Sequence, residues 1–166
     1  MALNIVIMAA GKGTRMKSAR PKVLHRVAGT TLLQHVLNTC VALQATRSIV
    51  ITGHGAEAVE AEAKGDKLCF VRQVPQLGTG HAIQQVIDVL DDRADTTLIL
   101  NGDVPLIRAD TAQALAAACH GEALALLTIE LADATGYGRI RRDAEGRVLG
   151  IVEHKDATPE QRSVRE

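Results

Sequence analysis

The sequence predicts an α/β fold, in which a mostly parallel β-sheet carries helices on both faces and a β-hairpin follows near the C-terminus. Three observations predict it. Uninterrupted apolar runs alternate with amphipathic helical patterns, each run ends in glycine or polar residues, and after Tyr137 the pattern changes to strand, turn and strand. Such runs are typical of strands covered on both faces, and their alternation with helices is typical of parallel sheets.

The predicted strands are short apolar runs bounded by turn residues: Ile5–Met8, Ser48–Thr52, Leu68–Val71, Thr96–Leu100 and Ala123–Ile129. The predicted helices lie between them and have apolar residues spaced for one face: Thr31–Leu43, Ala56–Ala63, His81–Leu90 and Thr111–Cys119. The hairpin is expected to pair Gly138–Arg142 with Arg147–Val152 across the turn Asp143–Gly146. The charged tail 155–166 has no convincing apolar face, so the chain looks cut rather than finished.

The composition of the chain argues against several classes of protein. A chain of 166 residues with 46% hydrophobic content suits one soluble domain with one core. Phe70 and Tyr137 are the only aromatic residues, which argues against a platform for single-stranded nucleic acid. The three cysteines are far apart and odd in number, and no apolar run approaches the ~20 residues that span a bilayer. We therefore expect a cytoplasmic protein that binds neither nucleic acid nor membrane.

The first apolar run leads into a glycine-rich turn, Gly11–Arg15, surrounded by positive charge. No acidic residue precedes Glu57, whereas this stretch holds Lys12, Arg15, Lys17, Arg20, Lys22, Arg26 and Arg47. Met16 stands where a dinucleotide fingerprint needs its third glycine, and the spacing does not match a Walker loop. Two interpretations stay open for the turn alone: a cradle for a triphosphate completed by Arg15 and Lys22, or a plain surface turn.

Further polar residues follow the other predicted strands, and ligands of open parallel sheets bind at these carboxyl ends. Asp103, after the fourth strand, is either a turn former or a ligand of Mg²⁺, and its position opposite a cationic loop favours the metal. The segment from Gln73 to His81 offers an amide, a close-approach backbone at Gly78 and a hydroxyl at Thr79, which suit the edge of a base. Thr79 also fits a helix N-cap, which is compatible with ligand contact.

At the level of motifs the chain resembles a known family. Gly11–Arg15 with Pro21–Lys22 is similar to the signature of sugar-nucleotide pyrophosphorylases. The blocks Gln76–Ala82, Gly102–Leu106, Thr135–Ile140 and Ile151–Thr158 go further. Together they resemble the bacterial bifunctional N-acetylglucosamine-1-phosphate uridyltransferases / glucosamine-1-phosphate acetyltransferases. This resemblance implies a Rossmann-like nucleotidyltransferase fold of the GT-A-like type, of which 1–166 is a partial uridyltransferase (pyrophosphorylase) domain.

The resemblance also implies roles for individual residues. Met8, Ala9, Ala10 and Gly11 line the nucleotide; Arg15 and Lys22 contact phosphates; and Gln73, Gly78 and Thr79 recognise uracil and neighbouring groups. Asn101, Gly102 and Asp103 border the ribose and sugar phosphate, with Asp103 on Mg²⁺, and Gly138 and Glu153 hold the N-acetylglucosamine. The implied catalytic residues are Arg15, Lys22 and Asp103.

The implied reaction joins UTP and N-acetylglucosamine 1-phosphate into UDP-N-acetylglucosamine and pyrophosphate, a supply step for peptidoglycan and lipopolysaccharide. The attacking phosphate is already an anion, so no general base is required and the six histidines are expected to be non-catalytic. Another sugar-1-phosphate nucleotidyltransferase, or a nucleotide-binding module without catalysis, stays as an alternative.

The chain departs from the family pattern in two ways. Asn101 stands where many relatives carry an aromatic residue. The family's uridyltransferase domain also continues beyond Glu166, with asparagines for the sugar and the metal, and its left-handed β-helix acetyltransferase domain is absent from this chain. We therefore expect a weak or inactive monomer from a parent homotrimer.

Overall fold

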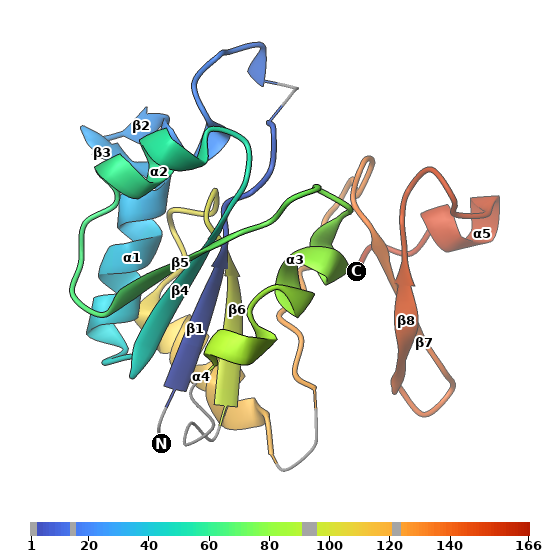
Figure 1. The fold of residues 1–166 in the computed structure, drawn as a ribbon. Helices are drawn as coiled ribbons and strands as arrows, with labels where there is room; N and C mark the ends of the chain where they lie inside the picture. Colours follow the sequence, from blue (N-terminus) through green and yellow to red (C-terminus); the bar gives the residue numbers. More distant parts are fainter. Residues whose placement is uncertain (1–2, 14–15, 91–95, 121–123) are drawn as a thin grey trace. The chain divides into compact units, whose positions relative to one another are not determined.

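The computed structural model describes residues 3–13, 16–90, 96–120 and 124–166, and the chain divides into two compact units. The first unit spans Met1–Leu124 and the second spans Ala125–Glu166 (Figure 1).

A four-stranded, fully parallel sheet forms the centre of the first unit. Its strands are β1 (Leu3–Met8), β4 (Arg47–Thr52), β5 (Leu68–Arg72) and β6 (Thr96–Asn101), in the order β5-β4-β1-β6. The register places Val6 of β1 opposite Ile49 of β4 and Ile99 of β6. All four strands were predicted from apolar runs, so the predicted parallel α/β sheet is confirmed.

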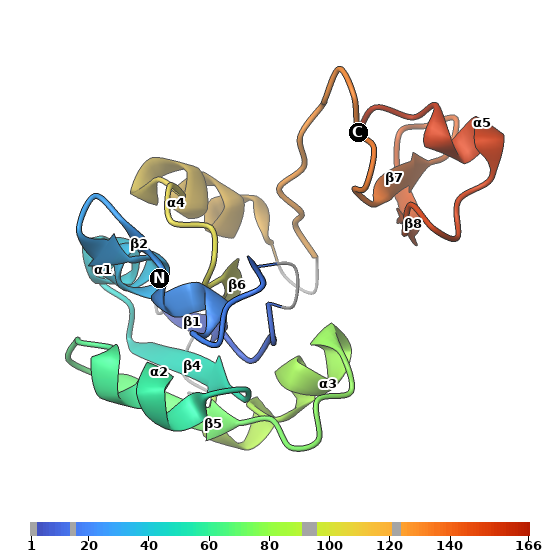
Figure 2. The same cartoon turned by 90° about the horizontal axis from the view of Figure 1, so that it is seen from above.

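Alternation along β1 divides its side chains between two apolar layers. Ile5 and Ile7, both fully buried, pack with residues of α1 (Leu32–Ala42), α2 (Ala56–Glu62) and α4 (Ala109–Ala118). Val6 packs in a second cluster with residues of α3 (Thr79–Gln84) and the 3-10 turn η3 (Ile87–Val89). Figure 2 shows α1 and α4 on one side of the strands and α3 on the other. Helices on both faces explain why β1 and β4 are buried almost throughout, whereas β6 alternates between buried and exposed residues, with Ile99 43% exposed.

The sequence did not predict several short elements of the first unit. After the first loop, η2 (Lys22–Leu24) leads into a small hairpin of β2 (Arg26–Val27) and β3 (Thr30–Thr31). Thr31 then caps α1, because its hydroxyl accepts a hydrogen bond from the Gln34 amide at 3.1 Å.

The helix predicted over His81–Leu90 is wrong in its bounds. It begins at Thr79, because Gly78 takes the N-cap position with φ 99°, and it ends at Gln84 before η3. Ile83, Val86 and Ile87 are β-branched, and such residues weaken a helix, which fits the early stop.

The second unit contains the predicted antiparallel hairpin, β7 (Arg139–Arg142) with β8 (Val148–Val152), and one helical turn, α5 (Pro159–Arg162). The strand predicted over Ala123–Ile129 is wrong for residues 124–129, which have no regular structure, while Ala123 lies outside the described residues. In place of a sheet neighbour, this segment contacts the tail: the hydroxyl of Thr128 donates to Glu166 at 2.8 Å. An apolar run predicts burial but does not specify a pairing partner.

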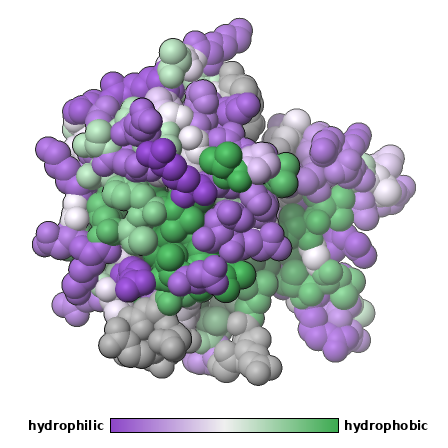
Figure 3. Space-filling view, viewed as in Figure 1, coloured by the Kyte–Doolittle hydropathy of each residue, from purple (hydrophilic) through white to green (hydrophobic). Residues whose placement is uncertain are grey.

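Apolar side chains also reach the surface of the second unit, as the green area over its hairpin shows (Figure 3). Leu149 and Ile151 of β8 are both 57% exposed. Within the part of the chain that the structure describes, no helix has the length and apolar character that a bilayer crossing demands.

Candidate functional site

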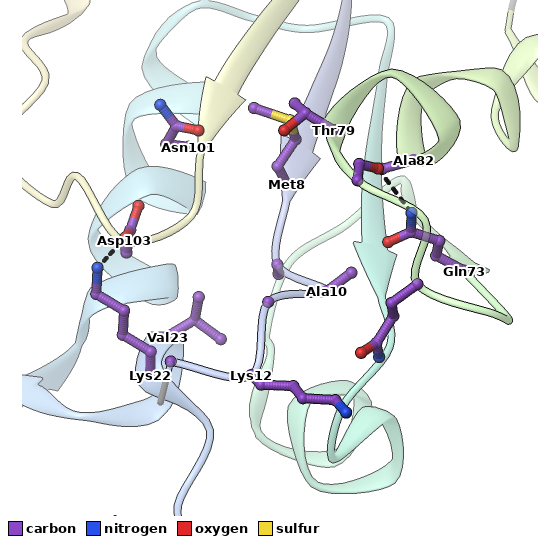
Figure 4. Close-up of a pocket in the computed structure, with 15 residues that line it drawn as sticks. Met8, Ala10, Lys12, Lys22, Val23, Gln73, Thr79, Ala82, Asn101 and Asp103 are labelled. Atoms are coloured by element: carbon purple, nitrogen blue, oxygen red, sulfur yellow. Dashed lines mark hydrogen bonds and ion pairs between the residues drawn. The ribbon is translucent and has the colours of Figure 1, made fainter. Parts of the chain in front are cut away.

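A cavity of about 630 Å³ opens at the carboxyl ends of β1, β5 and β6 in the first unit (Figure 4). Met8 forms its centre, with Lys22 and Asp103 on one side and Gln73 and Thr79 on the other. These side chains lie far apart in the sequence and meet because parallel strands end at the same edge.

Most residues expected to bind the nucleotide line this cavity: Met8, Ala9, Ala10, Gly11, Lys22, Gln73, Gly78, Thr79, Asn101 and Asp103. Gly102 does not line it and is instead buried, where an added Cβ would lie 3.1 Å from the Met8 carbonyl oxygen. Arg15 lies outside the described residues. In the second unit, Gly138 lines a smaller cavity of about 210 Å³, and Glu153 is exposed.

Two glycines bring the first loop close to Lys22. A Cβ on Gly13, which has φ 60°, would lie 2.7 Å from the Lys22 Cβ, so only glycine lets these backbones approach. A Cβ on Gly55, with φ 67°, would lie 2.6 Å from the Cγ of Pro21. The Pro21–Lys22 backbone is therefore packed between the loops that follow β1 and β4.

The ammonium of Lys22 forms an ion pair with Oδ2 of Asp103 (Figure 4). Their side chains are 36% and 30% exposed, so water reaches both groups. The carboxylate thus already faces a cation at the place where the sequence analysis expected a phosphate-binding lysine and a metal ligand.

Other cations of the N-terminal stretch are occupied elsewhere. Arg20 and Arg26 both pair with Glu62 of α2, at 2.8 and 3.5 Å, and Arg47 donates to the Val89 carbonyl at 2.6 Å. The positive charge that remains at the cavity among the described residues is that of Lys12 and Lys22. A count of charges along the sequence therefore overstated the positive charge at the cavity.

The opposite wall is built around Gln73, a residue that is only 4% exposed. Its amide nitrogen donates to the Gly78 carbonyl oxygen at 2.8 Å, and its amide oxygen points into the cavity (Figure 4). Thr79 makes no capping hydrogen bond, since Gly78 is the N-cap of α3. Capping therefore does not engage the Thr79 hydroxyl, and Thr79 lines the cavity.

The structure adds lining residues to which the sequence assigned no individual role: Lys12 and Gly13 of the predicted phosphate-binding turn, Gln76 of the segment Gln73–His81, and Val23 and Ala82. A signal existed for Gln76, which belongs to the polar segment between β5 and α3. No sequence signal marked Val23, because it reads as an ordinary core residue and is only 6% exposed.

The donor set suits a hard divalent cation that is shared with a substrate. No group of three or more His, Cys, Asp or Glu side chains converges to hold a metal within the described ranges. Asp103 supplies one carboxylate beside a cavity lined by cations. Mg²⁺ usually takes one or two protein carboxylates and completes its shell with substrate phosphates and water, so the residues fit such an ion.

The comparisons with known proteins agree with this geometry. The model of the MobA-like NTP transferase domain matches residues 5–136. The chain belongs to the MobA-like NTP transferase domain family. The expected enzyme class, a nucleotidyltransferase, is thereby confirmed, and the matched range contains every lining residue of the 630 Å³ cavity.

Relatives of this NTP transferase chain are named bifunctional protein GlmU. The chain is 68% identical to that of Methylibium petroleiphilum over 171 residues and 57% identical to that of Azotobacter vinelandii over 164 residues. Each match covers 99% of this chain but only 37% and 36% of the relative, so the chain spans about a third of their length.

Solved structures share the fold of this NTP transferase chain. A nucleotidyl transferase from Methanothermobacter thermautotroptrophicus has a TM-score of 0.67 and 25% identity, over 82% of this chain and 68% of that one. A UDP-glucose pyrophosphorylase complexed with UDP-glucose has a TM-score of 0.69 and 18% identity, over 99% and 73%. The manganese complex of Rv0371C from Mycobacterium tuberculosis has a TM-score of 0.58 and 23% identity, over 69% and 58%.

Proposed function

We propose that this chain carries the uridylyltransferase site of an enzyme that converts UTP and N-acetylglucosamine 1-phosphate into UDP-N-acetylglucosamine and pyrophosphate. The observation that carries the proposal is the cavity itself, which has a cation–carboxylate pair on one wall and a buried amide on the other. A charged wall suits phosphates and an amide suits a base edge. The relatives named GlmU, at 57–68% identity, support this choice among nucleotidyltransferases.

In the proposed reaction, a phosphate oxygen of the sugar phosphate attacks the α-phosphorus of UTP. The bond between that phosphorus and the oxygen bridging to the β-phosphate breaks, and pyrophosphate leaves with the electron pair. No proton has to be removed from the nucleophile. The chain's own contribution is to align the reactants and to neutralise charge, with Lys22 placed to donate to phosphate oxygens.

Mg²⁺ is the proposed metal, and Asp103 is the residue that would hold it. Such an ion neutralises charge on the phosphates when bound. Arg15, which lies outside the described residues, is proposed as a second phosphate contact, and Gly138 and Glu153 as contacts of the N-acetylglucosamine. These last two assignments rest on the motif resemblance.

The wider context is also a proposal. We infer a cytoplasmic reaction that supplies cell-wall and lipopolysaccharide synthesis. We further infer a whole protein that acetylates glucosamine 1-phosphate in a β-helix domain and trimerises through it. The chain 1–166 would then be a partial uridyltransferase domain and a monomer, which sedimentation of the purified chain tests directly.

The test separates binding from turnover. Calorimetry with UTP and Mg²⁺ measures binding to the chain, and pyrophosphate release from UTP with N-acetylglucosamine 1-phosphate, glucose 1-phosphate or no sugar measures transfer. Because the chain alone is expected to be weak or inactive, release is measured in the whole protein. There, Asp103→Asn is expected to lower release by orders of magnitude while thermal unfolding stays unchanged, and Asp66→Asn, at an exposed position away from the cavity, serves as the control. Binding of UTP without release for any sugar in the whole protein would leave a nucleotide-binding module in place of an enzyme. A preference for another sugar phosphate would show that this sugar phosphate, and not N-acetylglucosamine 1-phosphate, is the substrate.

A further inference from the structure

The side chain of His81 contacts the amide of Gln73 from behind the cavity wall. The amide nitrogen of Gln73 lies 3.1 Å from Nδ1 of His81 and 2.8 Å from the Gly78 carbonyl oxygen. His81 is partly buried on the first turn of α3, and it is not among the residues that line the cavity.

These contacts settle the direction of the amide. A primary amide has two N–H donors and one acceptor oxygen. The Gly78 carbonyl is only an acceptor and receives one N–H of Gln73 in addition to the Ala82 backbone N–H at 3.1 Å. Nδ1 of His81 receives the other N–H of Gln73. Both donors are then engaged, and the oxygen is the atom left for the cavity.

The same contacts specify the tautomer of His81. Because Nδ1 accepts from Gln73, the ring proton of the neutral imidazole is on Nε2. The side-chain amide nitrogen of Gln85, one helical turn later, lies 3.2 Å from Nε2 and donates to the His81 carbonyl oxygen at 3.3 Å. The contact between Gln73 and Nδ1 of His81 thus links the cavity wall to α3.

We propose that His81 is a positioning residue, which holds the Gln73 amide with its oxygen in the cavity and thereby sets a preference for uracil over cytosine. This inference rests on the proposed binding of a uridine nucleotide. The N3 position of uracil carries a proton that an oxygen can accept, whereas N3 of cytosine is itself an acceptor and repels that oxygen. Without His81, one N–H of Gln73 is released and the amide can turn to present a donor instead.

The experiment compares the affinities of UTP and CTP, each with Mg²⁺, for the chain and its variants by calorimetry. His81→Leu removes the acceptor and is expected to lower the UTP-over-CTP preference about tenfold or more. His81→Asn places an amide oxygen near the position of Nδ1 and is expected to restore the preference to within about threefold of the unaltered chain. His120→Leu, at an exposed histidine outside the cavity lining, is the matched control and should leave the ratio unchanged.

An equal loss of UTP and CTP affinity in His81→Leu would overturn the inference, because a merely structural role weakens both nucleotides together. Equal binding of UTP and CTP by the unaltered chain would overturn it too, while leaving the nucleotide site in place. If the chain binds neither nucleotide, the proposed function fails and the inference fails with it.

A second measurement does not depend on the folding of any His81 variant. Two-dimensional ¹⁵N NMR of the histidine rings in the unaltered chain distinguishes the two neutral tautomers. The inference requires a proton on Nε2 of His81 and an unprotonated Nδ1. A ring protonated on Nδ1 would refute it.

Discussion

Lys22 competes with any cation for the carboxylate of Asp103, and Lys22→Met tests this competition. The ammonium pairs with Oδ2 of Asp103 in this structure, so a divalent cation that binds there must displace it. With side chains 36% and 30% exposed, the pair is screened by water, and such pairs contribute about 0.2–1 kcal/mol. Removing the ammonium should therefore tighten Mn²⁺ binding in the absence of nucleotide by up to about fivefold.

The same substitution should have the opposite effect on UTP. A hydrogen bond from an ammonium to a phosphate oxygen is worth about 1.5–3 kcal/mol, so Lys22→Met should weaken UTP binding at saturating Mn²⁺ by about 10- to 150-fold. Mn²⁺ titrations followed by electron paramagnetic resonance, and calorimetry with UTP, measure the two affinities. Lys64→Met, at an exposed lysine away from the cavity, is the control. Unchanged or weaker Mn²⁺ binding in Lys22→Met would show that the ion pair does not occupy the metal ligand.

Three further predictions address the scaffold. Gly13→Ala should lower the free energy of unfolding by about 1–2 kcal/mol and weaken UTP binding, because Gly13 has φ 60° and an added Cβ meets the Lys22 Cβ at 2.7 Å. Gly29 has φ 81° and open space around it, so Gly29→Ala should lower stability without weakening UTP binding. Urea denaturation and calorimetry measure both quantities, and equal UTP affinities for the two variants would contradict the packing argument. Ile5→Val, in the core at 0% exposure, should lower the free energy of unfolding by about 1 kcal/mol, whereas Leu106→Ala, at 79% exposure, should change it by less than about 0.5 kcal/mol. Burial raises the pKa of the Cys40 thiol from 9.0 to about 11, so the native state keeps a proton that the unfolded chain loses. This proton contributes up to about 3 kcal/mol to the free energy of unfolding, a contribution that is complete below pH 9 and is lost as the pH rises through 11. Urea denaturation at several pH values should show a smaller alkaline loss of stability in Cys40→Ala than in the unaltered chain. Identical losses would argue against a buried neutral thiol.

The sequence predicted the central sheet because its strands carry an unambiguous signal. Ile5, Val6 and Ile7 are apolar without interruption, and the structure buries all three between two layers of helices. Once the strands are known, the rule that ligands bind at their carboxyl ends places Gln73 and Asp103 at one edge. Both line the cavity that the structure describes.

What the sequence did not predict depends on tertiary contacts. Nothing local indicates that Arg20 and Arg26 turn away to Glu62, or that Lys22 pairs with Asp103. The hydrogen bond between Gln73 and His81 likewise appears only when α3 has been placed against the end of β5. The sequence thus predicted which residues lie at the site, but not which other side chains orient them.

The packing of Pro21 and Lys22 between two glycine-containing loops has a kinetic consequence. With the backbone held by Gly13 on one side and Gly55 on the other, the proposed exchange of a carboxylate for a phosphate by Lys22 would need only rotation about its side-chain bonds. Rotamer changes of exposed side chains take picoseconds to nanoseconds, far less than the microseconds to milliseconds of domain motions. On this wall, the proposed binding of a nucleotide would therefore be limited by diffusion and charge, because the backbone beneath the lysine is already in position.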